Sequence, residues 1–286
     1  MKKFSIVKHA RIFFSITAVV LIVGIVSMFA RGFNLGIDFT GGSILDIKFD
    51  QPVTVAQVRT VLSDHQLGSS DQQVETSQSV LIRTGIISDS QRVDVMNDLS
   101  NRLGHNEVLR VENVGATVGG DLVKSAVGAV VLSWVLMIIY ITIRFELRFA
   151  LAAIVALIID VMVTLTWFSV LHLEIDSSFV AALLTVVGYS VNGTIVVFDR
   201  IRENLHTHRR NESMGELVDA SIWQTMTRSV YTTLTTLFAV VAIFLFGGET
   251  IHNFSFAMLV GFCSGFYTST FLAGSMWLFF RKKLKR

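Results

Sequence analysis

The chain has 286 residues, a formal net charge of only +2 and a hydrophobic fraction of 52%. Its mean hydropathy is +0.60 and it contains a single proline, which excludes an ordinary soluble protein and indicates an integral membrane protein. The single cysteine, Cys263, excludes an internal disulfide framework and a cysteine-based metal site. Because Cys263 lies in an apolar segment, we expect it to be a small core residue.

The N-terminal segment 1–11 is basic and leads directly into an apolar run. Its basic residues are Lys2, Lys3, Lys8 and Arg11. The apolar run over 12–30 has about the ~20 residues that a membrane-spanning helix needs. A cleavable signal peptide begins in a similar way, but this run is longer than usual and no small-x-small site follows it. We therefore predict an uncleaved signal-anchor that forms transmembrane helix 1.

A polar stretch over 31–121 separates this helix from a second apolar region over 122–280. The apolar segments of that region lie near 122–143, 149–171, 179–198, 222–246 and 254–280, which makes six predicted spans. Lysine and arginine are found in segment 1–11, the turn 144–148, the loop 200–227 and the tail 281–286, but not in the turns 172–178 and 247–253. The positive-inside rule therefore places both termini in the cytoplasm and domain 31–121 on the other side.

Domain 31–121 shows the patterns of four strands and two helices. The strands are predicted at 43–49, 72–77, 79–84 and 107–114. One helix follows Thr54 and presents Val55, Val58, Val61 and Leu62 on one face; the other opens at Asp89 and presents Val93, Met96, Leu99 and Leu103. The order βαββαβ predicts an extracytoplasmic α+β ferredoxin-like domain with both helices on one face of an antiparallel sheet.

A glycine-rich motif follows the first span. It reads Gly36-Ile37-Asp38-Phe39-Thr40-Gly41-Gly42. No Gly-Lys-Ser/Thr follows it, so a phosphate-binding P-loop is excluded in favour of a tight turn that starts the first strand of the domain.

Two charged residues, Asp160 and Arg228, lie well inside predicted spans, where charges are costly. Asp160 is about eleven residues, or roughly 16 Å, into the third span, with Thr164 one turn further on the same face. A functional carboxylate and a packing anchor are both open readings. Arg228 is ~9 Å inside the fifth span, ahead of Thr232 and Thr235, which we expect to form a hydroxyl-rich face inside the bundle. Snorkelling of Arg228 to the headgroups is the alternative.

The fourth span carries polar residues in its cytoplasmic half. Gly193 is ~9 Å from the cytoplasmic end, at the same depth as Arg228 on the next, antiparallel helix. Asn192 shares a face with Asp199, which is either part of a polar path or an ordinary charge at a helix end.

The loop 200–227 is rich in charge, and we expect a solvated surface whose basic half can contact anionic lipid. Its charged residues include Arg200, Arg202, Arg209, Arg210, His206, His208, Glu203, Glu212, Glu216 and Asp219. The i, i+2 spacing of the two histidines is poor for shared metal ligation, so no metal site is predicted. The chain also shows no nucleotide motif and no catalytic pattern, so we predict neither an enzyme nor a cofactor nor nucleic-acid binding.

Three blocks together resemble the SecD/SecF protein-export family of the resistance-nodulation-division superfamily. They are the motif 36–42, the fourth-span segments 187–192 (with Gly188, Tyr189 and Ser190) and 196–204, and Arg228 ahead of a threonine-rich helix. Length, six spans and one external domain agree with this resemblance along essentially the whole chain.

The resemblance implies a function in the bacterial cytoplasmic (inner) membrane. Members assist preprotein export outward through the SecYEG channel, driven by a proton or, in some members, a sodium gradient. SecD is the implied partner, with YajC, YidC, the preprotein and membrane lipid as further contacts.

One family position differs in this sequence. The fourth span of the family typically reads Gly-Tyr-Ser-(Ile or Val)-Asn-Asp-Thr, and that aspartate is taken to handle the ion with the arginine of the fifth span. Here the position is Gly193, and glycine cannot titrate. Asp160 corresponds to an aspartate that is usual in the third span, often after histidine, where this chain has Ile159.

Three readings follow. The first is an accessory translocase subunit whose partner SecD supplies the ion-coupling carboxylate. The second is a mainly structural subunit that holds SecD and the channel together, with Gly193 serving close helix packing. The third, a small-molecule exporter of the same superfamily, fits less well because such exporters carry larger external domains.

Overall fold

The computed structural model describes residues 4–68, 70–76, 78–207 and 213–283. The chain divides into two compact units, residues 1–34 with 127–286 and residues 35–126, and each is described separately.

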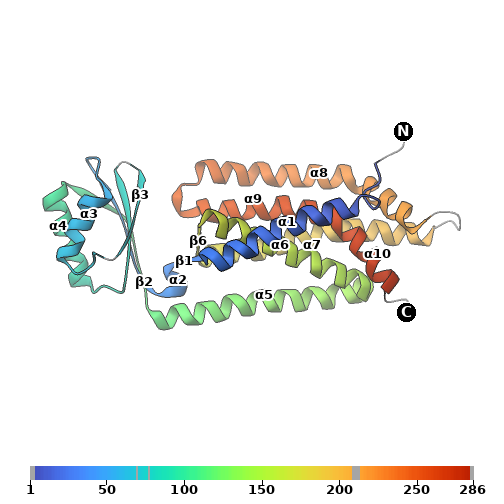
Figure 1. Cartoon of the computed structure of the whole chain (residues 1–286), viewed down its shortest axis with the longest axis horizontal. Helices are drawn as coiled ribbons and strands as arrows, with labels where there is room; N and C mark the ends of the chain where they lie inside the picture. Colours follow the sequence, from blue (N-terminus) through green and yellow to red (C-terminus); the bar gives the residue numbers. More distant parts are fainter. Residues whose placement is uncertain (1–3, 69, 77, 208–212, 284–286) are drawn as a thin grey trace. The chain divides into compact units, whose positions relative to one another are not determined.

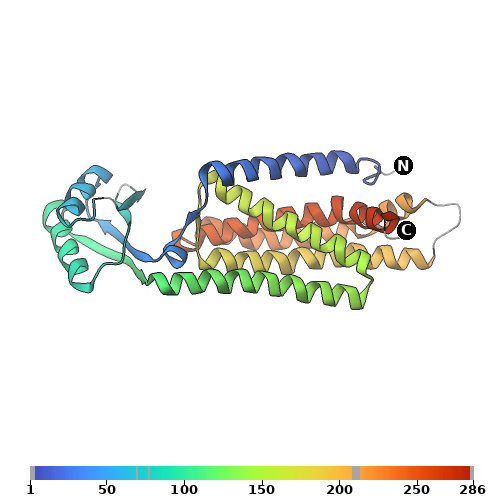
Figure 2. The same ribbon diagram turned by 60° about the horizontal axis from the view of Figure 1, so that its bottom comes forward.

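The first unit is a bundle of long apolar helices that run alongside one another (Figures 1 and 2). They are α1 (Ala10–Arg31), α5 (Ala116–Arg144, which starts in the second unit), α6 (Leu147–Leu171), α7 (Ser177–His206), α8 (Met214–Phe246) and a last span made of α9 (His252–Tyr267), the π-helical turn η2 (Thr268–Leu272) and α10 (Ala273–Lys283). The described residues thus hold six helical segments long and apolar enough to cross a membrane, which confirms the predicted number.

The helix ends differ from the prediction in two places. The predicted loop 200–227 is largely helical, because α7 continues to His206 and α8 starts at Met214. Ser213 and Glu216 form a capping box that starts α8 well before its apolar part. Similarly, α5 begins at Ala116 rather than near 122. Polar residues outside a membrane do not by themselves end a helix.

Helices α6, α7 and α9 form the buried centre of the bundle, whereas α1, α5 and α8 are largely exposed. Small residues allow the close contacts. A Cβ atom on Gly261 of α9 would lie 2.2 Å from Val186 Cγ2 of α7, and one on Gly24 of α1 would lie 1.9 Å from Thr166 Oγ1 of α6. Such close approaches are how helices gain packing energy in a membrane.

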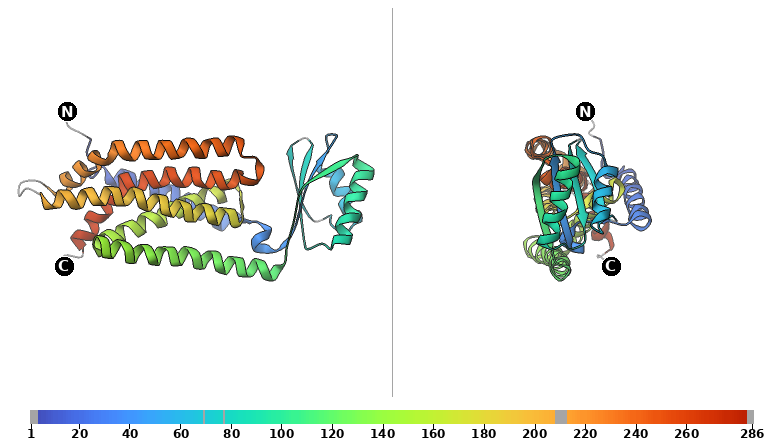
Figure 3. Two further views of the ribbon diagram at one scale, coloured as in Figure 1. Left: turned by 180° about the vertical axis from the view of Figure 1, so that it is seen from behind. Right: turned by 90° about the vertical axis from the view of Figure 1, so that its left-hand side faces the viewer.

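The second unit is a four-stranded antiparallel sheet with two helices (Figure 3). Its elements in chain order are β2 (Gly42–Phe49), α3 (Val55–Asp64), β3 (Asp71–Thr76), β4 (Ser79–Thr84), α4 (Asp89–Leu103) and β5 (Asn106–Val114). The strand order is β3-β4-β2-β5. Alternate residues of the central strands, such as Leu45 and Ile82, pack with Val58 of α3 and Leu99 of α4 in one buried cluster.

Both helices of this unit start with capping boxes, Thr54 with Gln57 and Ser88 with Gln91. The predicted inner face of α4 was wrong at Val93, which is exposed, while Val95 is buried. Val95 lies four residues before Leu99 and therefore shares its face, whereas a spacing of six residues turns Val93 away.

Short elements complete the chain. They are β1 (Asn34–Leu35), α2 (Ile37–Thr40), β6 (Glu174–Ile175) and the 3-10 turn η1 (Glu249–Ile251). The last residue of the second predicted strand, residue 77, lies outside the described residues.

Candidate intramembrane site

Asp160 lies fully buried in the middle of α6 and is held by hydroxyl groups from the neighbouring helices. Its carboxylate accepts hydrogen bonds from Ser190 Oγ of α7, from Ser264 Oγ of α9 at 2.6 Å, and from Thr268 Oγ1 of η2, which lies 3.0 Å from both carboxylate oxygens. We call these four residues the Asp160 cluster. One carboxylate therefore connects three separate helical segments to α6.

The local structure explains how these hydroxyls reach Asp160. Gly265 allows α9 to approach α7 closely, because a Cβ on it would lie 3.0 Å from Ser190 Cβ. The π-helical turn η2 begins at Thr268, and such turns often occur at functional sites. Thr164 is also buried, but its Oγ1 donates to the backbone oxygen of Asp160 at 2.9 Å and not to the carboxylate.

Gly193 and Arg228 line one small cavity of about 50 Å³, as their matching predicted depths imply. A Cβ built on Gly193 would lie 3.2 Å from Ser269 Oγ of η2, which lines the same cavity. Among the described residues, the Arg228 guanidinium has no hydrogen-bond or ion-pair partner, and no carboxylate lines this cavity.

A larger polar cavity of about 360 Å³ continues from the first. Asn192, Val196 and Arg228 line both cavities, and Asp199 and Glu203 line the larger one. The predicted shared face of Asn192 and Asp199 is confirmed. The carboxylates that share a cavity with Arg228 therefore come from the last turns of α7, and position 193 contributes none.

The expected hydroxyl-rich face inside the bundle was wrong for Thr235, whereas Thr232 lines the cavity of Gly193 and Arg228. Both are exposed on α8, and their hydroxyls donate to the backbone oxygens of Arg228 and Tyr231 at 2.9 and 3.0 Å. Thr233 points inward instead and accepts a hydrogen bond from the Tyr189 hydroxyl at 3.1 Å. Because α8 packs through only a narrow face, neighbouring positions on the helix turn outward.

The glycine-rich motif forms one helical turn, α2, which leads into β2, so the expected turn at the start of the first strand is present. Gly36 precedes α2, and Gly41 and Gly42 follow it with φ of +74° and +137°. A Cβ on Gly42 would lie 2.6 Å from the backbone oxygen of Thr84. The paired glycines are therefore required by backbone geometry, and nothing about the turn indicates a phosphate site.

Part of the predicted solvated loop is used in packing. Asp219 of α8 accepts hydrogen bonds from Ser5 Oγ and from the backbone N–H of Val7 at 2.9 Å, and Trp223 Nε1 donates to the Phe4 oxygen at 2.9 Å. The N-terminal segment thus docks on α8, a contact that sequence reasoning missed.

Other charges of the loop have local partners. Arg200 pairs with Glu203 at 2.9 Å, and Arg202 donates to the Arg144 backbone oxygen at 3.2 Å. His206 ends α7. His208, Arg209, Arg210 and Glu212 lie outside the described residues.

The hydroxyls of the last span were the main omission of the sequence analysis. Ser264 and Thr268 have the i, i+4 spacing that places two side chains on one helix face, and Ser269 is adjacent. Polar residues recurring one turn apart in an apolar helix were the available signal. Cys263, expected in the core, lies on the exposed side of α9.

Two family descriptions match the chain. Residues 95–283 match "Protein export membrane protein SecD/SecF, C-terminal", and residues 26–53 match the "SecD/SecF GG Motif". The second match contains the glycine-rich motif and the first contains every residue of the Asp160 cluster.

Curated relatives and solved structures agree with these matches. A protein translocase subunit SecF from Acidaminococcus fermentans is 97% identical over 293 aligned positions, covering 100% of both chains. SecF from Sebaldella termitidis is 39% identical over 95% of this chain and 90% of its own. The crystal structure of SecDF from Thermus thermophilus gives a TM-score of 0.90 at 33% identity, over 98% of this chain and 39% of that one. This chain therefore spans about two fifths of the solved SecDF chain, and it belongs to the SecD/SecF family of protein-export membrane proteins, among the SecF subunits of the protein translocase.

Proposed function

We propose that this subunit works with SecD to promote outward preprotein export, and that it couples export to the proton or sodium gradient through Asp160. The observation that carries this proposal is a fully buried carboxylate whose hydrogen bonds join α6 to α7, α9 and η2. Membrane-embedded ionisable groups are costly and are found mainly in ion pathways and relays.

The hydrogen bonds explain how a proton at Asp160 would move helices. An ionised carboxylate only accepts hydrogen bonds, so it can receive all three hydroxyls, from Ser190, Ser264 and Thr268. A protonated carboxyl carries a donor of its own, so at least one hydroxyl must turn to accept or lose its contact. Because these hydroxyls belong to different helical segments, protonation changes the packing between them.

For Arg228 we propose that SecD supplies the missing carboxylate. Gly193 leaves a cavity where the family has an aspartate, and the guanidinium lies on the exposed side of α8 without a partner among the described residues. An unpaired cation at this depth is stabilised by an opposite charge from a neighbouring subunit. The extensive exposed apolar surface of α5 and α8 supports such a neighbour.

We infer that the second unit is a ferredoxin-like domain that lies outside the bacterial inner membrane and couples to the preprotein, while both termini are cytoplasmic. The strand order β3-β4-β2-β5 with two helices supports this fold, and the basic residues at both ends of the chain support this orientation. SecYEG, YajC and YidC are the further proposed partners, and the role is non-enzymatic.

The test is Asp160→Asn, which keeps the shape of the side chain and removes its charge. We expect unchanged co-purification with SecD, while export by reconstituted SecDF and SecYEG no longer responds to an imposed proton or sodium gradient. Asp121→Asn, an exposed carboxylate in the second unit, is the control and should respond normally. A full gradient response in the Asp160→Asn subunit would remove the basis of the proposal.

A mainly structural subunit is the second candidate, and Gly193 favours it. The position lacks a titratable group, and its small size lets α7 approach η2 with only 3.2 Å between a built Cβ and Ser269 Oγ. Arg228→Gln separates the two candidates. If export still follows the gradient normally in both Arg228→Gln and Asp160→Asn, coupling resides in SecD and the structural function stands.

A further inference from the structure

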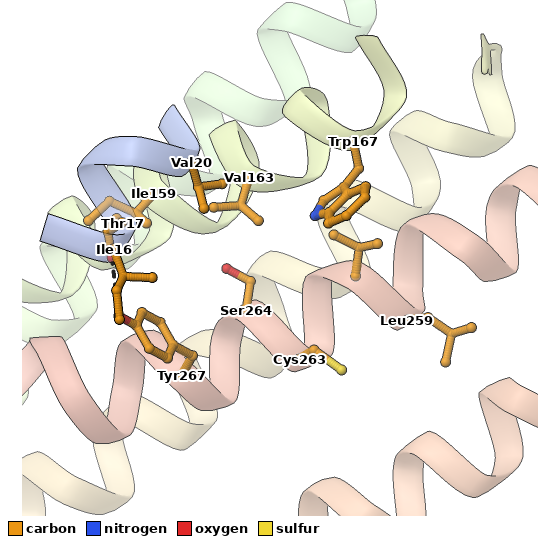
Figure 4. Close-up of a pocket in the computed structure, with 11 residues that line it drawn as sticks. Ile16, Thr17, Val20, Ile159, Val163, Trp167, Leu259, Cys263, Ser264 and Tyr267 are labelled. Atoms are coloured by element: carbon orange, nitrogen blue, oxygen red, sulfur yellow. Dashed lines mark hydrogen bonds between the residues drawn. The ribbon is translucent and has the colours of Figure 1, made fainter. Parts of the chain in front are cut away.

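A further cavity, of about 450 Å³ and apolar, lies between α1, α6 and α9 (Figure 4). Its walls are formed by Ile16 and Val20 of α1, Val163 and Trp167 of α6, and Leu259 and Cys263 of α9. Thr17 and Tyr267 close one end, and both bond to the Phe13 backbone oxygen, at 3.0 and 2.8 Å. The cavity offers almost no group to a polar ligand.

A groove along α1 leads from this cavity to a cation. Ile16 and Val20 also line a cavity of about 490 Å³ that extends to Ile12 and Arg11. Arg11 is exposed, and its guanidinium has no partner among the described residues. Arg11 and Val20 are separated by ~14 Å along the helix, so the two cavities together join a charged end to a long apolar interior.

We propose that this groove binds an anionic phospholipid, with its phosphate at Arg11 and one acyl chain along α1 in the apolar cavity. A guanidinium binds a phosphate through two parallel hydrogen bonds. An acyl chain is the only part of a membrane that fills an apolar cavity without leaving polar groups unpaired. Arg11 at the end of the helix matches the phosphate of such a lipid, and the continuous apolar groove matches its acyl chain.

The lipid tail would also touch the Asp160 cluster. Ser264 lines the apolar cavity and donates a 2.6 Å hydrogen bond to Asp160. A filled cavity therefore restricts the rotation of this hydroxyl, whereas an empty one leaves it free to turn. The lipid proposal depends only on the cavity and Arg11, so it does not depend on the proposed coupling of export to an ion gradient.

The first test measures lipid retention by the purified full-length chain. Native mass spectrometry after exposure to equal amounts of phosphatidylglycerol and phosphatidylcholine should show preferential retention of phosphatidylglycerol. Arg11→Gln should lower that retention about tenfold or more, as expected for the loss of a charge-assisted contact. Lys282→Gln, an exposed cation that lines neither cavity, should retain the lipid. Equal retention of the two lipids, or no effect of Arg11→Gln, would overturn the proposal.

The second test addresses the apolar cavity. Val163→Phe narrows the cavity and should release the lipid although Arg11 remains, whereas Val155→Phe, on an exposed part of the same helix, should not. Cys263 also lines the cavity, so its reaction rate reports whether the cavity is occupied in the unsubstituted chain. Alkylation of Cys263 by N-ethylmaleimide should be several-fold slower in phosphatidylglycerol vesicles than in phosphatidylcholine vesicles. Equal rates, or lipid retention by Val163→Phe, would show that no acyl chain occupies the cavity.

Discussion

Gly193→Asp tests whether a carboxylate in the small cavity beside Arg228 changes ion coupling. The substitution places a Cβ 3.2 Å from Ser269 Oγ and 3.5 Å from Ser269 Cβ, so the serine must move by a few tenths of an ångström. The carboxylate then enters a cavity of about 50 Å³ that Arg228 also lines. No other acid lines that cavity among the described residues.

Two opposing contributions set the size of the effect. Overpacking against Ser269 costs about 1 kcal/mol, the lower end of the usual range, because only a side chain has to move. A carboxylate about 4 Å from Arg228 gains roughly 4 kcal/mol at an effective dielectric constant of 20, and desolvation of both groups offsets much of that gain. We therefore expect a net change in the free energy of unfolding of at most about 2 kcal/mol, with a coupling to Arg228 of about 1–3 kcal/mol.

A double-mutant cycle measures that coupling directly. Gly193→Asp, Arg228→Gln and the double variant would be unfolded in mixed detergent and SDS micelles, and export with SecD would be followed in proteoliposomes. Assembly with SecD should stay intact while ion conductance or gradient-driven export changes. A coupling within about 0.5 kcal/mol of zero would show that the new carboxylate does not reach Arg228. Unchanged conductance and export would count against any coupling role for position 193.

Two further substitutions test the structural reasoning. Gly42→Ala should destabilise the second unit by about 2–3 kcal/mol, because φ is +137° and the new Cβ would meet Thr84 O at 2.6 Å. Faster amide hydrogen exchange in β2 and β4 reports this. Gly85→Ala should leave exchange unchanged, because no atom of the described part of the chain lies within 4 Å of the new Cβ. Thr268→Val should lower the free energy of unfolding in micelles by about 1 kcal/mol, because it removes the hydrogen bond to Asp160. Thr270→Val should change it by less than about 0.5 kcal/mol, because its buried hydroxyl has no hydrogen-bond partner among the described residues. Equal effects of the two substitutions would contradict the role given to Thr268.

The number of spans could be predicted from the sequence because length and apolarity alone decide whether a helix can cross a membrane. The helix ends could not, because residues after Asp199 are polar but continue α7 to His206. Similarly, the polar stretch before Ile222 is already part of α8. Polarity marks where a helix leaves the membrane, whereas caps such as Ser213 mark where the helix begins.

The sequence predicted how deep the candidate-site residues lie in the membrane, but not which face of the helix each one occupies. Counting residues placed Gly193 and Arg228 at one level, and the structure brings them to one cavity. Thr232 and Thr235 were both expected on an inner face, but only Thr232 lines that cavity, and the hydroxyls of both donate to backbone oxygens of α8. Which face of α8 is inside depends on contacts with distant segments such as α9, and no local pattern contains them.

The turn η2 connects the two polar sites through adjacent residues. Thr268 donates to Asp160, and the next residue, Ser269, lines the cavity of Gly193 and Arg228. Successive residues of a helix point in different directions, so one turn can place a hydroxyl in each site. Loss of the Thr268 contact would let the turn rearrange and would move Ser269 with it, while a side chain at position 193 would push on Ser269 from the other side. We infer that Asp160→Asn and Gly193→Asp have non-additive effects on export, because a shared turn and not a direct contact joins the remaining carboxylate to the position where one is missing.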